Sequence, residues 1–421
     1  MAVVTFDKVD VVFGPKPAAA LALLDEGEDK ESIFEATGHV VGVEGASFAV
    51  EEGEIFVIMG LSGSGKSTLL RCVNGLNRVT RGRVLVEDEG GQVDVSRAER
   101  EVLRRLRMKR ISMVFQQFAL MPWRNIGENV AFGLEVRGVA KAERERRVRE
   151  VLELVHLAQW LDKYPHELSG GMQQRVGLAR AFATDADILL MDEPFSALDP
   201  LIREHLQDEL LEFQRKLKCT ILFVSHDLDE ALKLGSRVAM MEGGRIIQVG
   251  RPEEIITRPN TEYVREFVAN VNPLNVLRGA SLMRLRAELE RDPEAADTVY
   301  LDRAGRYRCR LDGDGRPTAA TADGVPARLV VYNPSLELTS LAATDIVTGT
   351  LETTMRTAIE VRHATERPMP LLDEAGRLVG VIGAIELLAG MLRRSESQGA
   401  APGAPEEVAD EGAGLAPRAR G

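Results

Sequence analysis

The segment Gly60-Leu-Ser-Gly-Ser-Gly-Lys66-Ser67-Thr68 most strongly constrains the fold of this chain. It matches the pattern GxxxxGK[ST], follows the apolar run IFVIMG and precedes the helical sequence STLLRCVNGL. In such a loop the glycines let successive backbone N–H groups point inward around a phosphate, and the helix adds the positive end of its dipole. The order strand, loop, helix therefore predicts a phosphate-binding loop on an α/β fold with a parallel sheet.

The side chains of this loop have separate expected roles. Lys66 reaches the β and γ phosphates, the Ser67 hydroxyl binds Mg²⁺, and Thr68 assists at the α or β phosphate. A chance glycine-rich turn is disfavoured, because the strand and the helix are both in place. The remaining predicted nucleotide-binding residues of the loop are Gly60, Ser62, Gly63 and Gly65.

The run Ile188-Leu-Leu-Met-Asp192-Glu193 predicts a buried strand that ends in two carboxylates. Asp192 is placed to hold Mg²⁺ through water, and Glu193 to polarise an attacking water. Two acidic residues at a strand end are by themselves a weak signal. Downstream of a phosphate-binding loop at this separation, they favour nucleotide hydrolysis.

Residues 168–175, LSGGMQQR, lie just before a predicted helix and resemble the signature motif of the ATP-binding cassette (ABC) ATPases. The other motifs of that family are present in order. Gln116, after the strand MVF, resembles the Q-loop glutamine, and residues 196–199, SALD, resemble the D-loop. His226, in LFVSHD, resembles the switch histidine. An LSGG alone would be a weak signal, but the full ordered set of motifs leaves little room for chance.

The resemblance implies that one copy of the chain holds only part of each site. Two copies would pair head-to-tail in a symmetric homodimer that encloses two ATP molecules. ATP held by Lys66 of one copy would be covered by Ser169, Gly170 and Gly171 of the other, and Asp199 belongs to the same nucleotide-binding set.

The catalytic set that the resemblance implies is Glu193, His226 and Gln116. Gln116 would touch Mg²⁺ or the lytic water, and His226 would stabilise charge on the γ-phosphate. Phe13 is the candidate for stacking on adenine, with a simple core role as the alternative. A predicted helical insertion at about 17–39 separates it from the next strand.

The amino-acid composition limits the kinds of partner that this chain can bind. The 421 residues carry a net charge of −12 and only 5% aromatics, which argues against a nucleic-acid surface. Cys72, Cys219 and Cys309 are sparse and show no metal-ligand spacing, which fits a reducing compartment. With neither a signal peptide nor a membrane-spanning run visible, we expect a cytoplasmic protein whose membrane role depends on partners.

The alternation of strand and helix patterns predicts a nucleotide-binding domain with a parallel sheet over residues 1–270. A helical subdomain is expected at about 96–180. A small C-terminal α/β domain is expected over 276–393, and a disordered tail over 394–421, which is rich in Gly, Ala, Pro and Glu.

Two C-terminal segments resemble each other at an offset of 71 residues. LDRAGR at 301–306 precedes YRCRL, and LDEAGR at 372–377 precedes LVGVI and the helical run AIELLAGML. Each predicts a strand, a turn and a strand, which suggests two pseudo-symmetric halves of one domain. The alternative is two unrelated hairpins with similar turns.

The cassette is most similar to the quaternary-amine importers, on the run ALALLDEGEDKESIFEATGH, the phosphate-loop region and DILLMDEPFSALDPLIR. QQFALMPWR at 116–124 resembles the choline branch. The C-terminal repeat resembles a degenerate pair of cystathionine-β-synthase-type (CBS) modules.

This resemblance implies an ATPase on the cytoplasmic face of the membrane that energises import of choline or a related amine such as glycine betaine. Its partners would be two permease subunits and an external substrate-binding protein. The alternatives are an importer of another small solute and a regulatory ATPase without a permease.

Overall fold

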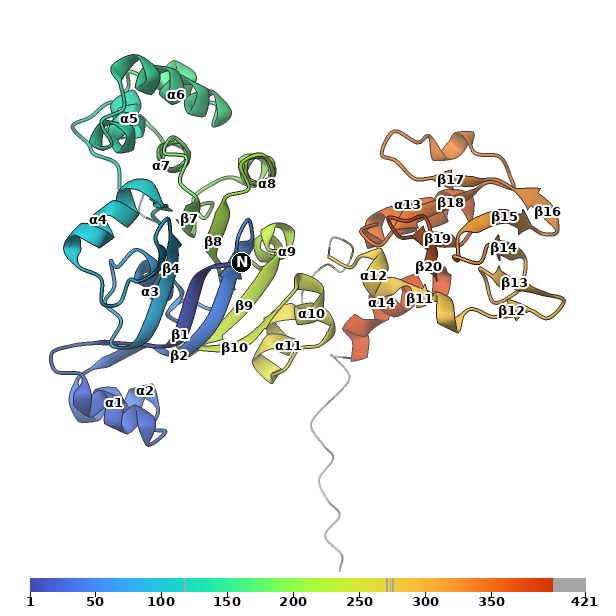
Figure 1. Ribbon diagram of the computed structural model, residues 1–421, viewed down its shortest axis with the longest axis horizontal. Helices are drawn as coiled ribbons and strands as arrows, with labels where there is room; N and C mark the ends of the chain where they lie inside the picture. Colours follow the sequence, from blue (N-terminus) through green and yellow to red (C-terminus); the bar gives the residue numbers. More distant parts are fainter. Residues whose placement is uncertain (117–118, 270–271, 273, 275, 397–421) are drawn as a thin grey trace, which may run out of the picture.

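The computed structural model describes residues 1–116, 119–269, 272, 274 and 276–396. Figure 1 shows an N-terminal α/β unit, coloured blue to yellow, and a C-terminal unit in orange and red. Most of the tail that we predicted from residue 394 onward therefore lies outside the described residues. No helix in the described part of the chain is long and apolar enough to cross a bilayer.

A six-stranded sheet forms the centre of the N-terminal unit. Its strands are β3 (Ile55–Met59), β6 (Ile111–Val114), β7 (Ile188–Asp192), β8 (Thr220–Ser225), β9 (Arg237–Glu242) and β10 (Arg245–Gly250). They lie in the order β10-β9-β3-β8-β7-β6, and only the edge pair β10–β9 is antiparallel. Every residue of β3, β7 and β8 is buried, which confirms the parallel α/β core expected from their apolar runs.

A second, antiparallel sheet covers one face of this core. It contains β1 (Ala2–Phe13), β2 (Val40–Glu51), β4 (Arg81–Asp88) and β5 (Gly91–Asp94), in the order β2-β1-β4-β5. The parallel sheet therefore does not include every strand of the predicted range 1–270. The pairs β1–β2, β1–β4 and β4–β5 are all antiparallel, so these four strands form a separate sheet.

The two faces of the central sheet separate two hydrophobic cores. Phe56 and Ile58 pack with the antiparallel sheet and with α3 (Lys66–Val73). Ile55, Val57 and Met59 face the opposite side, because side chains alternate along a strand. The helices on that side include α8 (Pro200–Leu217) and α9 (Leu228–Leu234), followed along the chain by α10 (Pro252–Thr257) and α11 (Glu262–Val268).

The segment between β1 and β2 forms two helices, α1 (Ala18–Asp25) and α2 (Lys30–Thr37). Asp29 caps the second helix by accepting from Ser32 N at 2.8 Å, and Gly38 ends it with φ at 70°. These helices bury apolar residues against the ends of β1 and β2. The cluster consists of Val12, Ala20, Leu24, Ile33 and Val41.

A helical layer extends beyond the edge of the central sheet (Figure 1). It contains α5 (Ile126–Val136), α6 (Lys141–Leu154) and α7 (Gly170–Phe182), with two short 3₁₀ turns, Ala158–Trp160 and Pro165–Glu167. The helix α4 (Arg100–Lys109) and the strand β6 precede this layer, so the predicted range 96–180 includes one strand of the central sheet.

The C-terminal unit contains two five-stranded sheets. One has the order β11-β20-β19-β18-β17, with strands β11 (Arg284–Leu285), β17 (Leu329–Val331), β18 (Ile346–Thr350), β19 (Met369–Leu372) and β20 (Leu378–Ile382). The other runs in chain order from β12 to β16: β12 (Arg291–Asp292), β13 (Ala295–Tyr300), β14 (Tyr307–Leu311), β15 (Pro317–Ala322) and β16 (Val325–Ala327). Its helices are α12 (Gly279–Leu282), α13 (Met355–Thr365) and α14 (Ala384–Glu396).

The two similar C-terminal segments both form the turns of antiparallel hairpins, β13–β14 and β19–β20. In each turn an aspartate accepts a backbone hydrogen bond: Asp302 from Tyr307 N at the start of β14, and Asp373 from Arg377 N just before β20. The second hairpin continues into α14, whereas the first continues into β15 and β16. The two segments therefore share a hairpin but differ in the element after it.

Candidate functional site

The loop between β3 and α3 has a backbone that only glycine can supply at two positions. Gly60 and Gly65 have φ values of 156° and 100°. A Cβ added at Gly60 would lie 2.1 Å from Met241 O, and one at Gly65 would lie 2.3 Å from Gly42 O. The loop is therefore held against β2 and the end of β9 by close backbone contact.

Lys66 begins α3 and turns back over this loop. Its Nζ donates to Gly60 O at 2.8 Å and to Leu61 O at 2.9 Å, and the residue is 5% exposed. Burial lowers the pKa of Lys66, and the negative charges of Glu193 and Asp192 oppose that shift. The Oγ of Ser64 is buried with no hydrogen-bond partner in the described part of the chain. A phosphate oxygen would supply such a partner.

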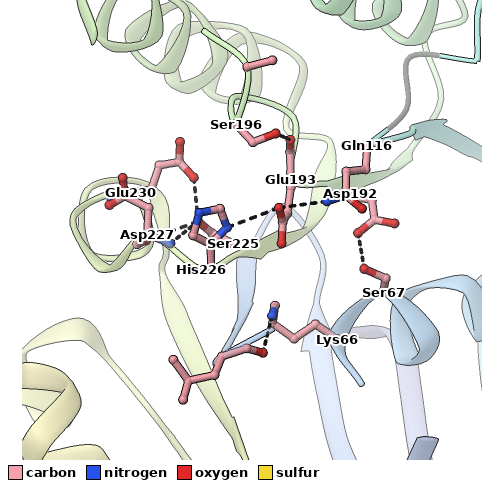
Figure 2. A network of polar contacts seen from close by, with 12 residues as sticks. Lys66, Ser67, Gln116, Asp192, Glu193, Ser196, Ser225, His226, Asp227 and Glu230 are labelled. Carbon is pink, nitrogen blue, oxygen red and sulfur yellow. Dashed lines mark hydrogen bonds and ion pairs between the residues drawn. The ribbon is translucent and has the colours of Figure 1, made fainter. Parts of the chain in front are cut away.

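Asp192 ends β7 opposite the start of α3 and is fully buried. Ser67 Oγ donates to Asp192 Oδ1 at 2.6 Å, a contact that Figure 2 shows. The other carboxylate oxygen, Oδ2, accepts from Arg71 Nη2 at 2.8 Å. Both oxygens of the buried carboxylate are therefore bonded to side chains of α3.

Glu193 stands directly after β7 and has a left-handed backbone, with φ at 48°. Its Oε2 accepts from Gln116 Nε2 at 3.1 Å and lies 3.2 Å from His226 Nδ1. Figure 2 shows these three side chains converging from three different strand ends. The structure thus brings together the three predicted catalytic residues around one carboxylate.

The signature residues begin α7 on the surface. Ser169 caps that helix by accepting from Met172 N at 3.4 Å, and Ser169 and Gly170 are both exposed. A Cβ added at Gly170 would meet no described atom within 4 Å. Gly171 is half-buried beside Ala197 O and Leu198. This helix N-terminus therefore presents an open surface that can meet an anion.

Gln174, one turn into α7, links the signature helix to the carboxylate segment. Its Nε2 donates to Glu193 O at 3.3 Å, and its Oε1 accepts from Ala197 N at 3.2 Å. The hydroxyl of Ser196 donates to the same Glu193 carbonyl at 3.1 Å. Asp199 caps α8 by accepting from Ile202 N, so the predicted D-loop runs directly from Glu193 to this helix.

Phe13 ends β1 and is 44% exposed. A Cβ added at Gly42 would lie 2.8 Å from Phe13 Cε2 and 3.2 Å from Thr68 Cγ2. The ring therefore lies over Gly42 close to the first turn of α3, with part of its surface open. The ring is thus not a fully buried core side chain, and its stacking on adenine stays a prediction.

The donors near Asp192 suit Mg²⁺. They are oxygen donors from Ser67, Asp192 and Gln116, the ligand type that this cation prefers. The described residues contain no cluster of three or more His, Cys, Asp or Glu side chains able to hold a metal. Mg²⁺ in such sites is bound by few protein groups together with the phosphates, so the sparse set fits.

Two residues of this site were not predicted from the sequence. Arg71 lies within the run STLLRCVNGL and Gln174 within LSGGMQQR, but the motif patterns give neither residue a role. The spacing of Arg71, one helical turn after Ser67, was the signal that could have revealed it. The contacts of Gln174 depend on how α7 packs, which no local pattern reports.

Comparisons with known proteins agree with this geometry. The family model described as ABC transporter matches residues 43–196. The chain is 42% identical over 386 residues to the glycine betaine transport ATP-binding protein OpuAA of Bacillus subtilis, covering 89% of each chain. It is 41% identical over 411 residues to the glycine betaine/proline betaine transport system ATP-binding protein ProV of Salmonella typhimurium, covering 92% of this chain and 97% of ProV.

A solved structure shows the same cassette fold. The dimeric, post-hydrolysis structure of the ATP-binding cassette MJ0796 bound to ADP and Pi has a TM-score of 0.51 and 28% identity. It covers 59% of this chain and 98% of that chain, so the C-terminal unit is an addition to the cassette. The chain is therefore a transport-coupled ATPase that belongs to the ABC proteins of the glycine betaine/proline betaine import family.

Proposed function

We propose that two copies of this chain hydrolyse ATP between them and energise the import of a quaternary amine through membrane permease subunits. The observation that carries this proposal is the convergence of Gln116 and His226 on the Glu193 carboxylate, beside the Ser67–Asp192 pair. That arrangement serves phosphoryl transfer, where positioning and charge stabilisation supply most of the catalysis.

In this proposal the β- and γ-phosphates lie in the loop before α3. Lys66, whose Nζ now bonds two loop carbonyls, would turn to the phosphates and neutralise their charge. Ser67, Asp192 and Gln116 would hold Mg²⁺, which supplies charge stabilisation at the β- and γ-phosphate oxygens. Glu193 would orient the attacking water, and His226 would donate to the γ-phosphate.

The second copy would complete each site. Ser169, Gly170 and Gly171 lie at a helix N-terminus where Ser169 and Gly170 are exposed, and Asp199 begins the next helix along the D-loop. Head-to-tail pairing would place this exposed helix end over the phosphates bound by the other copy. The cassette MJ0796, whose fold this chain shares, is described as dimeric with ADP and Pi bound.

A groove in the helical layer provides a docking surface for the permease. It has a volume of about 680 Å³ and is lined mainly by charged residues of α5, α6 and the loop before α5. Trp123, the one aromatic residue among the described residues of its lining, is 74% exposed, which is unusual for so large an apolar ring. The groove comes after Gln116 in the chain, so a bound permease helix could move the Glu193 network.

The identity of the transported solute is the most specific part of the proposal. The relatives include proteins named for glycine betaine and proline betaine transport, and one of Ruegeria pomeroyi, 45% identical, named for trimethylamine N-oxide transport. We propose a small quaternary amine, with choline as the variant that the 116–124 segment suggests. Residues 117–118 of that segment lie outside the described residues. Recognition of the amine would rest on an aromatic cage in a separate binding protein.

The C-terminal unit, 276–393, is proposed to be a degenerate CBS pair that regulates the cassette. It contacts α10 through Arg278 Nε, which lies 3.7 Å from Glu253 Oε1, and Ser281 Oγ donates to the same carboxylate. A test is AMP binding to the full chain carrying Lys66→Ala, which weakens the cassette site. Absence of binding would leave this unit a structural element.

The experiment for the main proposal is reconstitution of the chain with its permease and binding protein in vesicles. The ATPase rate is measured without solute, with glycine betaine and with choline. Stimulation by either amine supports the proposal, and the stronger response identifies the cargo. If neither amine raises the rate although ATP is hydrolysed, the cargo or the permease coupling is wrong.

A further inference from the structure

Arg71 forms the only described ion pair of the buried carboxylate Asp192. The Nη2 of Arg71 lies 2.8 Å from Asp192 Oδ2, and the Asp192 side chain is 0% exposed, whereas that of Arg71 is 37% exposed. The second oxygen, Oδ1, accepts from Ser67 Oγ at 2.6 Å. The carboxylate is therefore fixed at both oxygens.

The two partners of Asp192 come from one helix. Ser67 and Arg71 are four residues apart in α3, and residues at this spacing lie on the same helix face. The phosphate-binding helix thus holds the end of β7 by two bonds, although Arg71 and Asp192 are separated by 121 residues in the chain. Rotation of the carboxylate would break one of these two bonds.

A buried carboxylate that loses its counter-charge is strongly destabilised. The Arg71 charge offsets that penalty at one oxygen and leaves the other directed at the Ser67 hydroxyl.

We infer that Arg71 is a positioning residue of the magnesium site: its contact with Asp192 Oδ2 holds the carboxylate in the orientation in which Asp192 and Ser67 act together on the metal. The inference rests on the proposed function of these two residues. Arg71 itself touches neither the phosphate-binding loop carbonyls nor Glu193 among the described contacts, so its effect would pass through Asp192.

The Arg71–Asp192 contact uses one end of the guanidinium. The Nε of Arg71 is buried with no hydrogen-bond partner in the described part of the chain, so only an Nη atom bonds the carboxylate. A lysine can supply one donor and the same charge, though not the guanidinium geometry. Arg71→Lys should therefore retain part of the function that Arg71→Met removes.

The test compares Arg71→Met, Arg71→Lys and a control, Arg83→Met. Arg83 forms an exposed ion pair with Asp7, with Arg83 Nη2 2.6 Å from Asp7 Oδ2, away from the described site. Mn²⁺ binding in the presence of ATP is measured by electron paramagnetic resonance. ATP binding and the unfolding temperature are measured without metal, and ATPase activity is followed as a function of Mg²⁺.

Arg71→Met should weaken Mn²⁺ binding by about tenfold or more, as loss of a residue that orients a metal ligand does elsewhere. ATP binding without metal should change less than about twofold, since Lys66 remains. The metal-free protein should unfold at a lower temperature, because a buried carboxylate is left uncompensated. Arg71→Lys should lie between Arg71→Met and the native chain, and Arg83→Met should match the native chain.

Native Mn²⁺ affinity in Arg71→Met, or in Arg71→Lys if the methionine variant does not fold, overturns the inference. The proposed function is tested separately by the native chain and Asp192→Asn. If the native chain hydrolyses ATP and Asp192→Asn loses Mn²⁺ while the Arg71 variants keep it, only the role of Arg71 is wrong. If the native chain shows no metal-dependent hydrolysis, the proposed function itself fails.

Discussion

The two halves of the nucleotide site in this chain differ in how complete they are. Around the phosphate-binding loop, Lys66, Ser67 and Asp192 are bonded to other groups of the same chain, and Asp192 is fully buried. At the start of α7, Ser169 and Gly170 are exposed, and Gly170 has open space around it. The half around the phosphate-binding loop is preorganised inside a single chain. The half at the start of α7 is an exposed helix end that presents an open surface.

In the proposed dimer, this difference marks the boundary between the groups that each copy contributes to one site. A preorganised set of charges and hydrogen bonds belongs where the chemistry occurs, because a fixed arrangement lowers the cost of reorganisation in the transition state. An open helix N-terminus gains its value only when an anion approaches it. The contrast therefore predicts that loss of a buried residue impairs the ATP site on the chain that carries the change. Loss of a signature residue should instead impair the ATP site on the partner copy.

The largest expected effect comes from Glu193→Gln. The amide keeps the shape and the contacts with Gln116 and His226 but cannot act as a base, so turnover should fall by roughly a hundredfold or more. ATP binding should persist, and the variant should accumulate as a closed dimer in size-exclusion chromatography with ATP. Glu89→Gln, at an exposed position, is the control. Turnover at the native rate would show that Glu193 is not the base.

Lys66→Ala comes next, because it removes one charge-assisted contact to the triphosphate. Such contacts to a charged group contribute about 1.5–3 kcal/mol, so ATP affinity should fall by about one to two orders of magnitude. Titration with a fluorescent ATP analogue measures this loss, with the exposed Lys141→Ala as control. Unchanged affinity would mean that the triphosphate does not lie in this loop.

A smaller loss is expected for Ser169→Ala, about tenfold in ATPase rate with ATP affinity retained, since one hydrogen bond to the phosphate is removed. The sharper measurement mixes Ser169→Ala with Lys66→Ala. In a head-to-tail dimer of the two, one site has a native loop and a native signature, so the mixture should hydrolyse faster than either variant alone. A rate equal to the average of the two would contradict the divided site.

Most residues around the phosphate-binding loop could be predicted from the sequence, because short sequence motifs contain them. A strand, a glycine loop and a helix place Lys66 and Ser67, and parallel strands end at the same edge of a sheet, which brings Asp192 beside them. The spacing of Arg71 from Ser67 places both residues on one face of α3, but the contact of Arg71 with Asp192 forms only where β7 meets that helix. The same holds for Gln174, whose contacts depend on how α7 packs on the segment after Glu193.

The C-terminal unit was harder to predict. Turn residues such as Asp302 and Asp373 determine a hairpin locally, and both hairpins are present. The element after a hairpin depends on packing against the rest of the domain, and here one hairpin continues into strands and the other into a helix. The antiparallel sheet at the N-terminus was missed for a similar reason, because pairing between distant strands has no local signature.

Phe13→Ala should have a modest effect, since stacking of one aromatic ring is worth about 0.5–1.5 kcal/mol. We expect ATP affinity to fall about two- to tenfold and Phe13→Trp to preserve it. Phe34→Ala, at an exposed ring in α2, is the control for loss of surface aromatic area. Equal affinity for ATP and inorganic triphosphate in the native chain would show that Phe13 does not contact the base.

The smallest expected effect is the response of the three cysteines to thiol reagents. All three are buried, and burial raises their pKa to about 12 for Cys72, about 11 for Cys219 and about 12 for Cys309. Because the thiolate is the reactive form and a raised pKa reduces its population, labelling at about pH 8 should be slow in the native chain and complete only after unfolding.

Cys72 lies in α3, on the helix that carries Ser67 and Arg71, so it reports on the buried half of the site. Iodoacetamide at the same pH should therefore leave the ATPase rate unchanged, and mass spectrometry should find Cys72 unmodified in the native chain. Faster labelling of Cys72 in Arg71→Met than in Arg83→Met would show that α3 loosens when its contact with Asp192 is lost. Rapid labelling in the native chain would instead mean that this half of the site opens readily, which would weaken the contrast with the exposed signature.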